Sequence, residues 1–158
     1  MADIKERYGF SSWPVGSIME ENGMSVNCRL EEDTGFELLD RRALPWPKSY
    51  EDIYQSREDA DIRISVRVIN CESFEEAKEQ LASHLSQCAA YKLPQVTGRM
   101  DAFSADIAFG AADGSGKAIR AVRGNAVVLV RNIGRRAIDL FPVYGMLNER
   151  IHLARTKK

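Results

Sequence analysis

The stretch from Ala118 to Ile133, AIRAVRGNAVVLVRNI, constrains the fold more than any other part of the chain. Its second half, Asn125–Arg131, is the most apolar and β-branched segment of the sequence, which predicts a central strand. A shorter run, Ala118–Val122, precedes it, and the two runs meet at Gly124, where a tight turn or a bulge is tolerated. The stretch therefore predicts two neighbouring strands in the core of a sheet.

Further strands are predicted on the N-terminal side of this stretch. Residues Ile62–Val68 alternate between apolar and polar side chains, which is typical of a strand with one buried face and one wet face. Residues Ala105–Phe109 extend into a glycine-rich turn that leads back to Ala118. With Val127–Asn132 as the third member, three successive strands then form an antiparallel meander that Gly134 closes.

Two helices follow from capping signals combined with helical periodicity. Ser73 with Glu76 forms a capping box, and the apolar stripe behind it predicts a helix over Phe74–Tyr91, before Pro94. Asp139 can cap a last helix that begins near Leu140 and tolerates a proline in its first turn. The predicted apolar face of this last helix consists of Leu147, Ile151, Met146 and Ala154.

The N-terminal third of the sequence is less regular. Residues 1–23 lack periodicity and predict irregular structure, whereas Met24–Leu30 and Phe36–Leu39 predict a hairpin. The prolines of Pro45–Pro47 interrupt regular pairing and mark an internal boundary. A helix-start signal then predicts a short helix over Tyr50–Arg57.

The length of 158 residues suits one domain, and no internal repeat is present. Taken together, the predicted elements indicate a single α+β domain spanning residues 1–158, with an irregular N-terminal segment. The predicted architecture is a single antiparallel β-sheet with helices packed on one face.

Net charge and hydropathy restrict which classes of binding partner and which cellular compartment the sequence favours. The chain has 22 basic and 23 acidic side chains, and a net charge of -1 argues against nucleic-acid binding. No apolar run approaches the roughly 20 residues of a transmembrane helix, and the first residues lack the apolar core of a leader. As written, the sequence predicts a cytoplasmic protein; the alternative is a periplasmic or secreted protein whose leader has been removed.

The three cysteines are Cys28, Cys71 and Cys88, and none of them forms a CxxC pair. Isolated buried thiols are the favoured interpretation, and one disulfide with a free thiol is the alternative. His84 and Cys88 lie four residues apart on the predicted helix, but two ligands do not make a zinc site. We therefore predict no metal and no cofactor, and a partly buried structural pair at these two positions.

Catalytic and phosphate-binding motifs are incomplete. The loop from Gly110 to Ala118, GAADGSGKA, lacks the spacing and the following helix of a P-loop, so a hairpin turn is favoured. No GxSxG sequence surrounds any serine, and a cysteine hydrolase that uses Cys71 or Cys88 with His84 is disfavoured because apolar-face thiols are generally inert.

Arginines concentrate around the opening stretch, at Arg120, Arg123, Arg131, Arg135 and Arg136. If they share a face, they form a basic patch that can bind an anionic ligand or partner; because strands alternate their faces, a scattered wet surface is the alternative. The candidate ligand-binding residues are Arg123, Arg131, Arg99 and Asp106. No catalytic residue is assigned.

The C-terminal third carries Asp106-Ile-Ala-Phe-Gly, a variable turn, Val122-Arg-Gly-Asn-Ala-Val-Val-Leu-Val, Gly134, and a helix through Leu147-Asn-Glu-Arg-Ile151. This order resembles the closing part of bacterial extracytoplasmic sensor-like and lipoprotein domains, such as the extracellular sensor domains of mycobacterial serine/threonine kinases. The resemblance implies an extracytoplasmic ligand- or partner-binding module without catalytic residues. The chain departs from the pattern because it shows no leader and no paired set of cysteines.

Three hypotheses for the function follow. The first is a non-enzymatic bacterial module that binds a small ligand or a protein partner, because a well-specified core comes without a coherent catalytic set. The second is a small enzyme whose dispersed polar site uses residues such as Asp101, Asp106, His84 and Arg99. The third is an immunity or regulatory protein that works by docking. The sequence does not indicate the ligand, the partner or the oligomeric state.

Overall fold

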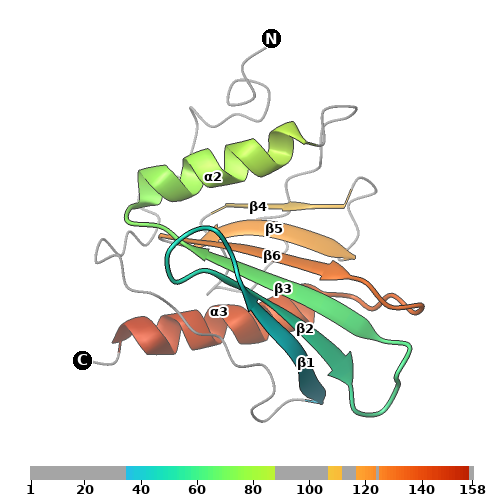
Figure 1. Ribbon diagram of the computed structural model, residues 1–158. Helices are drawn as coiled ribbons and strands as arrows, with labels where there is room; N and C mark the ends of the chain where they lie inside the picture. The colour runs from blue at the N-terminus through green and yellow to red at the C-terminus, as the bar shows by residue number, and fades with distance from the viewer. Residues whose placement is uncertain (1–34, 88–106, 112–116, 124, 157–158) are drawn as a thin grey trace.

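A six-stranded antiparallel sheet dominates the computed structural model, which describes residues 35–87, 107–111, 117–123 and 125–156 (Figure 1). The strands follow the order β1-β2-β3-β6-β5-β4, and every neighbouring pair is antiparallel. The elements are β1 (Phe36–Ala43), β2 (Tyr50–Ser56), β3 (Arg63–Asn70), α2 (Phe74–Ser86), β4 (Ile107–Gly110), β5 (Ala118–Arg123), β6 (Ala126–Asn132) and α3 (Phe141–Thr156).

The predicted α+β class with one antiparallel sheet is confirmed. Strand β6 is one of the two central strands, as its apolar and β-branched composition predicts. It pairs with β5 from Arg123↔Ala126 to Ala118↔Arg131, and β5 pairs in turn with β4, so the predicted meander is present. The core of the sheet is therefore the stretch that the sequence singles out.

Each face of the sheet carries one helix (Figure 1). Side chains alternate between the two faces along every strand, so apolar residues at neighbouring positions supply a core beneath each helix. The cluster beneath α3 includes Val66, Ala121, Val128, Val130, Val143, Tyr144 and Leu147. The cluster beneath α2 includes Ile69, Val122, Val127, Phe109, Ala77, Leu81 and Leu85. The helical layer is thus divided between the two faces, whereas the sequence predicted both helices on one face. The alternation along a strand shows which residues share a face, but not which face a given helix covers.

The predicted short helix over Tyr50–Arg57 is wrong, because these residues form strand β2. Tyr50 and Tyr54 are buried beneath the α3 layer, and Asp52 lies on the same face between them with no exposed surface. A buried carboxylate at this position hides the apolar alternation that identifies a strand. Pairing with β1 and β3 along both edges outweighs the local helix-start signal.

Strand β1 pairs with β2; the predicted hairpin between Phe36–Leu39 and Met24–Leu30 involves a segment that lies outside the described residues. The register shifts between Leu38 and Asp40, which leaves Leu39 as an extra residue on this edge strand. The predicted boundary at Pro45–Pro47 is the turn that joins β1 to β2. Lys48 in this turn has a positive φ of 56°.

Both helices begin where their capping residues predict. In α2 the Ser73 hydroxyl accepts a hydrogen bond from the Glu76 backbone N–H at 3.1 Å, and the Glu76 carboxylate accepts one from the Glu72 N–H at 3.0 Å. Helix α2 is observed as far as Ser86; the predicted continuation to Tyr91 lies outside the described residues. At the start of α3, the Asp139 carboxylate accepts a hydrogen bond from the Phe141 N–H at 3.0 Å.

Neither of the described helices is long and apolar enough to cross a membrane.

Candidate functional site

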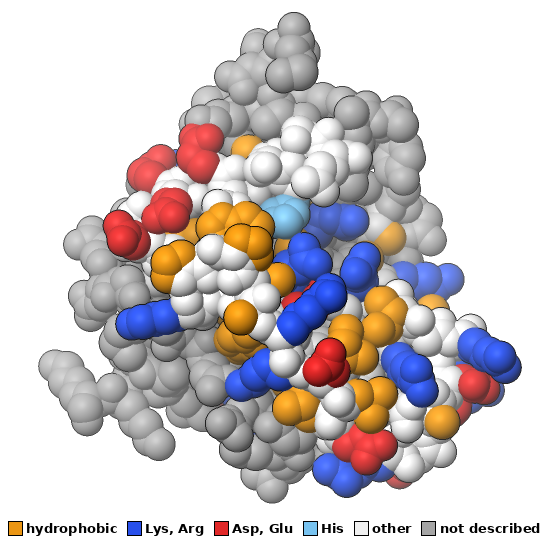
Figure 2. Space-filling view, viewed as in Figure 1, with side chains coloured by type: hydrophobic (Ala, Val, Ile, Leu, Met, Phe, Trp, Pro, Cys, Tyr) orange, Lys and Arg blue, Asp and Glu red, His pale blue; other side chains and the backbone are white. Residues whose placement is uncertain are grey.

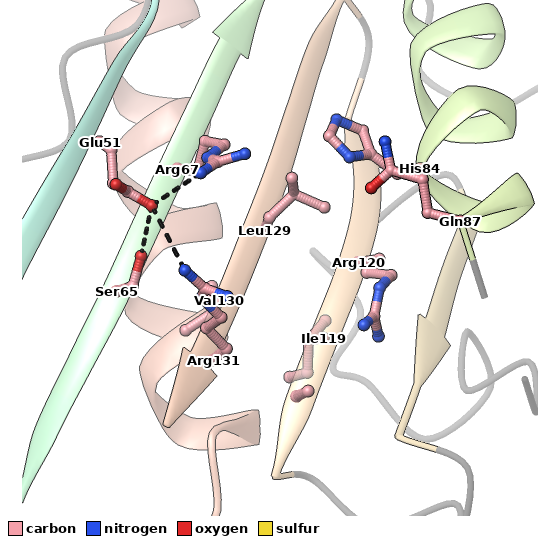
Figure 3. Close-up of a pocket in the computed structure, with 11 residues that line it drawn as sticks. Glu51, Ser65, Arg67, His84, Gln87, Ile119, Arg120, Leu129, Val130 and Arg131 are labelled. Carbon is pink, nitrogen blue, oxygen red and sulfur yellow. Dashed lines mark hydrogen bonds and ion pairs between the residues drawn. The ribbon is translucent and has the colours of Figure 1, made fainter. Parts of the chain in front are cut away.

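A cavity of about 160 Å³ lies between the C-terminal end of α2 and the part of the sheet that α2 leaves uncovered (Figure 3). Strands β2, β3, β5 and β6 contribute the floor, α2 contributes His84, and Gln87 follows as the C-cap of this helix. Lys and Arg side chains gather on this face of the molecule (Figure 2). At roughly 30 Å³ per molecule, the volume corresponds to about five waters, so a small ligand fits.

Strand register explains why these side chains meet. Glu51, Arg67, Leu129 and Arg120 are successive cross-strand partners on β2, β3, β6 and β5, so they form one row across the α2 face. Two residues further along, Ser65 on β3 faces Arg131 on β6. Directly opposed residues in antiparallel strands have Cβ atoms about 5 Å apart. The pairing of four strands therefore brings three arginines and one glutamate into the same region.

Glu51 is the buried centre of this charge network, because its side chain is only 2% exposed. It accepts hydrogen bonds from the Ser65 hydroxyl at 2.9 Å, Arg67 Nη2 at 3.1 Å and Arg42 Nε at 2.7 Å. A further guanidinium nitrogen, Arg131 Nη2, lies 3.9 Å from Glu51 Oε2. Burial alone would raise the pKa of Glu51, but the hydrogen bonds from Ser65, Arg42 and Arg67 outweigh it and lower the pKa. Glu51 is therefore a carboxylate at neutral pH.

Arg120 stands apart from this network. It lines the cavity from β5, and its Nη1 atom is buried without a hydrogen-bond partner among the described residues. An unpaired buried donor on a charged group is costly, so native structures usually satisfy it with a side chain, water or ligand. Arg120 therefore brings to the cavity lining a guanidinium with one hydrogen-bond donor that has no partner among the described residues.

His84 on α2 lies on the side of the cavity opposite to Glu51 and Arg67 (Figure 3). In Figure 3 its imidazole and the guanidinium of Arg67 point toward one another across Leu129. Burial, together with the positive charges of Arg67 and Arg120, lowers the pKa of His84. The imidazole is therefore neutral at pH 7, which leaves the arginines as the positive charges of the site.

The structure separates the candidate ligand-binding residues that the sequence predicts. Arg131 lines the cavity, whereas Arg123 is 1% exposed and has the same parity on β5 as Ile119 and Ala121, which face α3. The two arginines thus lie on opposite faces of the sheet. Arg99 and Asp106 lie outside the described residues.

Sequence reasoning missed Glu51 and Arg67 as site residues, and it did not select Arg120 or His84 among the ligand-binding candidates. Glu51 was hidden by the wrong helix prediction for its segment. Arg67 belongs to the polar side of the alternating strand Ile62–Val68, but nothing in the sequence shows that Arg120 lies across the sheet from it. Their shared face could be recognised only by aligning β3, β6 and β5 in register.

Other reactive groups in the described residues lie elsewhere. Burial, with a smaller contribution from Glu76, raises the pKa of the free thiol of Cys71 to about 12, so this cysteine is unreactive. No group of three His, Cys, Asp or Glu side chains among the described residues could hold a metal ion. On the α3 face, the Arg41 guanidinium donates two hydrogen bonds of 2.6 and 2.7 Å to the Asp52 carboxylate and packs over the Tyr50 ring.

No protein-family model, curated protein or solved structure was found to match this chain. The resemblance of the C-terminal third to extracytoplasmic sensor-like domains stays a prediction.

Proposed function

We propose that this protein is a non-enzymatic binding module that takes a small anionic ligand into the cavity beneath α2. The observation that carries the proposal is Arg120, which lines the cavity and whose buried Nη1 has no hydrogen-bond partner among the described residues. An anion above Leu129 would satisfy this donor and reach the neighbouring guanidinium of Arg67. Charge-assisted hydrogen bonds of this kind are the strongest that side chains form.

The charge balance of the cavity favours an anion. Arg67, Arg120 and Arg131 line it together with the single carboxylate of Glu51, which also accepts hydrogen bonds from Arg42 outside the lining. Among the described residues, four guanidiniums against one carboxylate leave three positive charges. The C-terminal end of α2 offsets only about half a charge. The protein has a net charge of -1, so this positive region is local and does not reflect a basic chain.

Binding explains the cavity better than catalysis does. Ser65 is the hydroxyl residue of the lining, and its proton is donated to Glu51. Because its pKa is lowered, the Glu51 carboxylate is a weak base. A nucleophile needs a nearby base whose pKa lies close to the working pH. Four partners, Ser65 and three arginines, hold Glu51 in place through hydrogen bonds or ion pairs. Its role is therefore to orient the arginines.

The proposal is tested by anion binding to the purified full chain. A panel of inorganic and carboxylate anions is screened at constant ionic strength by thermal unfolding, and hits are measured by calorimetry. For the anion that binds, Arg120→Met is expected to weaken the affinity by about tenfold or more, the value of one charge-assisted hydrogen bond. The matched control is Arg63→Gln, which removes a positive charge on the same sheet face outside the cavity lining.

The control variant is expected to retain wild-type affinity, because Arg63 contacts Gln55 and does not line the cavity. The proposal is wrong if no anion in the panel stabilises the wild-type chain beyond chloride at equal ionic strength. It is also wrong if Arg120→Met and Arg63→Gln weaken binding equally. Substrate turnover that disappears on His84→Gln would replace it with an enzymatic function.

A further inference from the structure

We propose that the group held in this cavity is a tetrahedral dianion, such as a phosphoryl group, bound by Arg67, Arg120 and Arg131 together. The inference rests on the proposed function and specifies its ligand class.

The three arginines form a triangle around an apolar floor. Arg67 on β3 and Arg120 on β5 are the cross-strand neighbours of Leu129 on either side of β6. Arg131 follows Leu129 on β6 and shares its face. With adjacent strands about 4.8 Å apart, the flanking arginines originate roughly 10 Å from one another, a span that two long side chains can close over Leu129. Guanidiniums from three strands can therefore reach one small group from three directions.

The number of guanidiniums matches a dianion. Arg42, outside the cavity lining, hydrogen-bonds to Glu51 through both Nε and Nη2. Arg67 and Arg131 are ion-paired with the same carboxylate, so its single negative charge compensates each of them only in part. Arg120 makes no ion pair with any described residue. A monoanion would leave a substantial part of the positive charge uncompensated. Two negative charges on one small group neutralise more of this charge than a monoanion does.

A carboxylate site in the same molecule provides a comparison. On the α3 face, one guanidinium suffices for one carboxylate, since Arg41 Nε and Nη2 bind the two oxygens of Asp52 at 2.6 and 2.7 Å. A carboxylate presents the lone pairs of its two oxygens in a single plane. A phosphoryl or sulfuryl group presents three oxygens in different directions. The cavity, of about 160 Å³, also accommodates such a group with a short organic part.

The experiment measures the binding of four probe anions to the full chain by calorimetry at pH 7.5 and constant ionic strength. Inorganic phosphate and sulfate are tetrahedral, malonate carries two planar carboxylates, and acetate carries one. Sulfate and phosphate are expected to bind at least about tenfold more tightly than acetate, with malonate between them. Arg120→Met and Arg131→Gln are each expected to weaken sulfate binding by about tenfold. Arg63→Gln is expected to leave it unchanged.

Arg131→Gln is included because the Arg131 side chain is 61% exposed and its Nη2 lies 3.9 Å from Glu51 Oε2, so its loss should not impair folding. If acetate binds as tightly as sulfate and Arg120→Met abolishes both, the dianion inference fails while anion binding stands. If none of the four probes binds, both fail. If sulfate binds but Arg131→Gln has no effect, the three-arginine arrangement is wrong.

Discussion

At the scale of single residues, Glu51 has the largest influence on the site. It lies on the sheet face that α2 only partly covers, yet it is almost completely buried, because arginines from β1 and β3 and the Ser65 hydroxyl surround it. A buried carboxylate is tolerated when it is both paired and hydrogen-bonded. Glu51 therefore stabilises the fold and orients Arg67 beside the cavity.

Replacing this carboxylate should cost stability in a pH-dependent way. Glu51→Gln is expected to lower the free energy of unfolding by about 2 kcal/mol at pH 7, because charge-assisted hydrogen bonds are lost. The folded-state pKa of Glu51 is lowered, so its contribution is complete above the unfolded pKa of about 4.3. It is lost as the pH falls through the folded pKa.

Urea unfolding between pH 3 and pH 7 measures this difference. Wild-type and Glu51→Gln chains should converge in stability at the acid end. The control Glu58→Gln alters an exposed carboxylate and should change stability by no more than about 0.5 kcal/mol. A difference between wild type and Glu51→Gln that stays constant across this range would show that charge is not the cause.

His84 should make anion binding sensitive to pH. Its pKa is lowered by burial and by Arg67 and Arg120, with Glu51 and Arg131 as the other charged groups of the cavity lining. A bound dianion would raise the pKa of His84, so binding takes up protons and tightens as the pH falls. Glu51 does not compete, because its lowered pKa keeps it ionised.

The measurement uses sulfate, which stays a dianion between pH 8 and pH 5.5. Affinity should rise by up to about tenfold over this range, the factor that corresponds to one pKa unit. His84→Gln should bind sulfate with a nearly flat pH profile. An unchanged slope in this variant would assign the pH dependence to another group.

At the scale of the elements, the segment after β6 is tied to the turn before β3. The backbone N–H groups of Ile133 and Gly134 both donate to the Arg63 carbonyl, at 2.9 and 3.2 Å. The Arg136 N–H donates to the Asp61 carbonyl at 3.0 Å, and its guanidinium reaches Asp59 at 2.7 Å. These contacts hold the far ends of β3 and β6 together before the chain enters α3.

Gly134 is required at this crossing because there is no space for a side chain. A Cβ atom there would lie 2.3 Å from the Asp61 carbonyl oxygen and 2.6 Å from the Arg63 nitrogen, both rigid backbone atoms. Gly134→Ala is therefore expected to destabilise the protein by about 1–3 kcal/mol, the usual cost of overpacking. Thermal or urea unfolding measures the change.

Gly35 supplies the matched control, since nothing lies within 4 Å of a Cβ added there. Gly35→Ala should leave stability within about 0.5 kcal/mol of wild type. If Gly134→Ala is equally neutral, the close approach of the two segments is not rigid. The sequence identified Gly134 only as the end of the meander; its contact with Asp61 depends on strand pairing.

At the scale of the whole molecule, the two faces of the sheet differ in what covers them. Helix α3 packs on an apolar layer from β2, β3, β5 and β6. Helix α2 covers only the end of the other face that carries Ile69, Val122 and Val127, so the row containing Arg67 and Arg120 stays beside an open cavity. The division creates a stable core and a binding surface in one small domain.

The sequence by itself determined the local elements. Alternating and β-branched residues specified β3, β5 and β6. A capping box specified where α2 begins and a capping aspartate where α3 begins, because these signals depend on neighbours along the chain. Only the tertiary structure decided that β2 is a strand and that Arg131 and Arg123 lie on opposite faces. It also decided that Arg67 and Arg120 flank Leu129 in one row. Each of these facts depends on the register between segments that are distant in sequence. The residues of a single segment do not show which residues of another strand it will face.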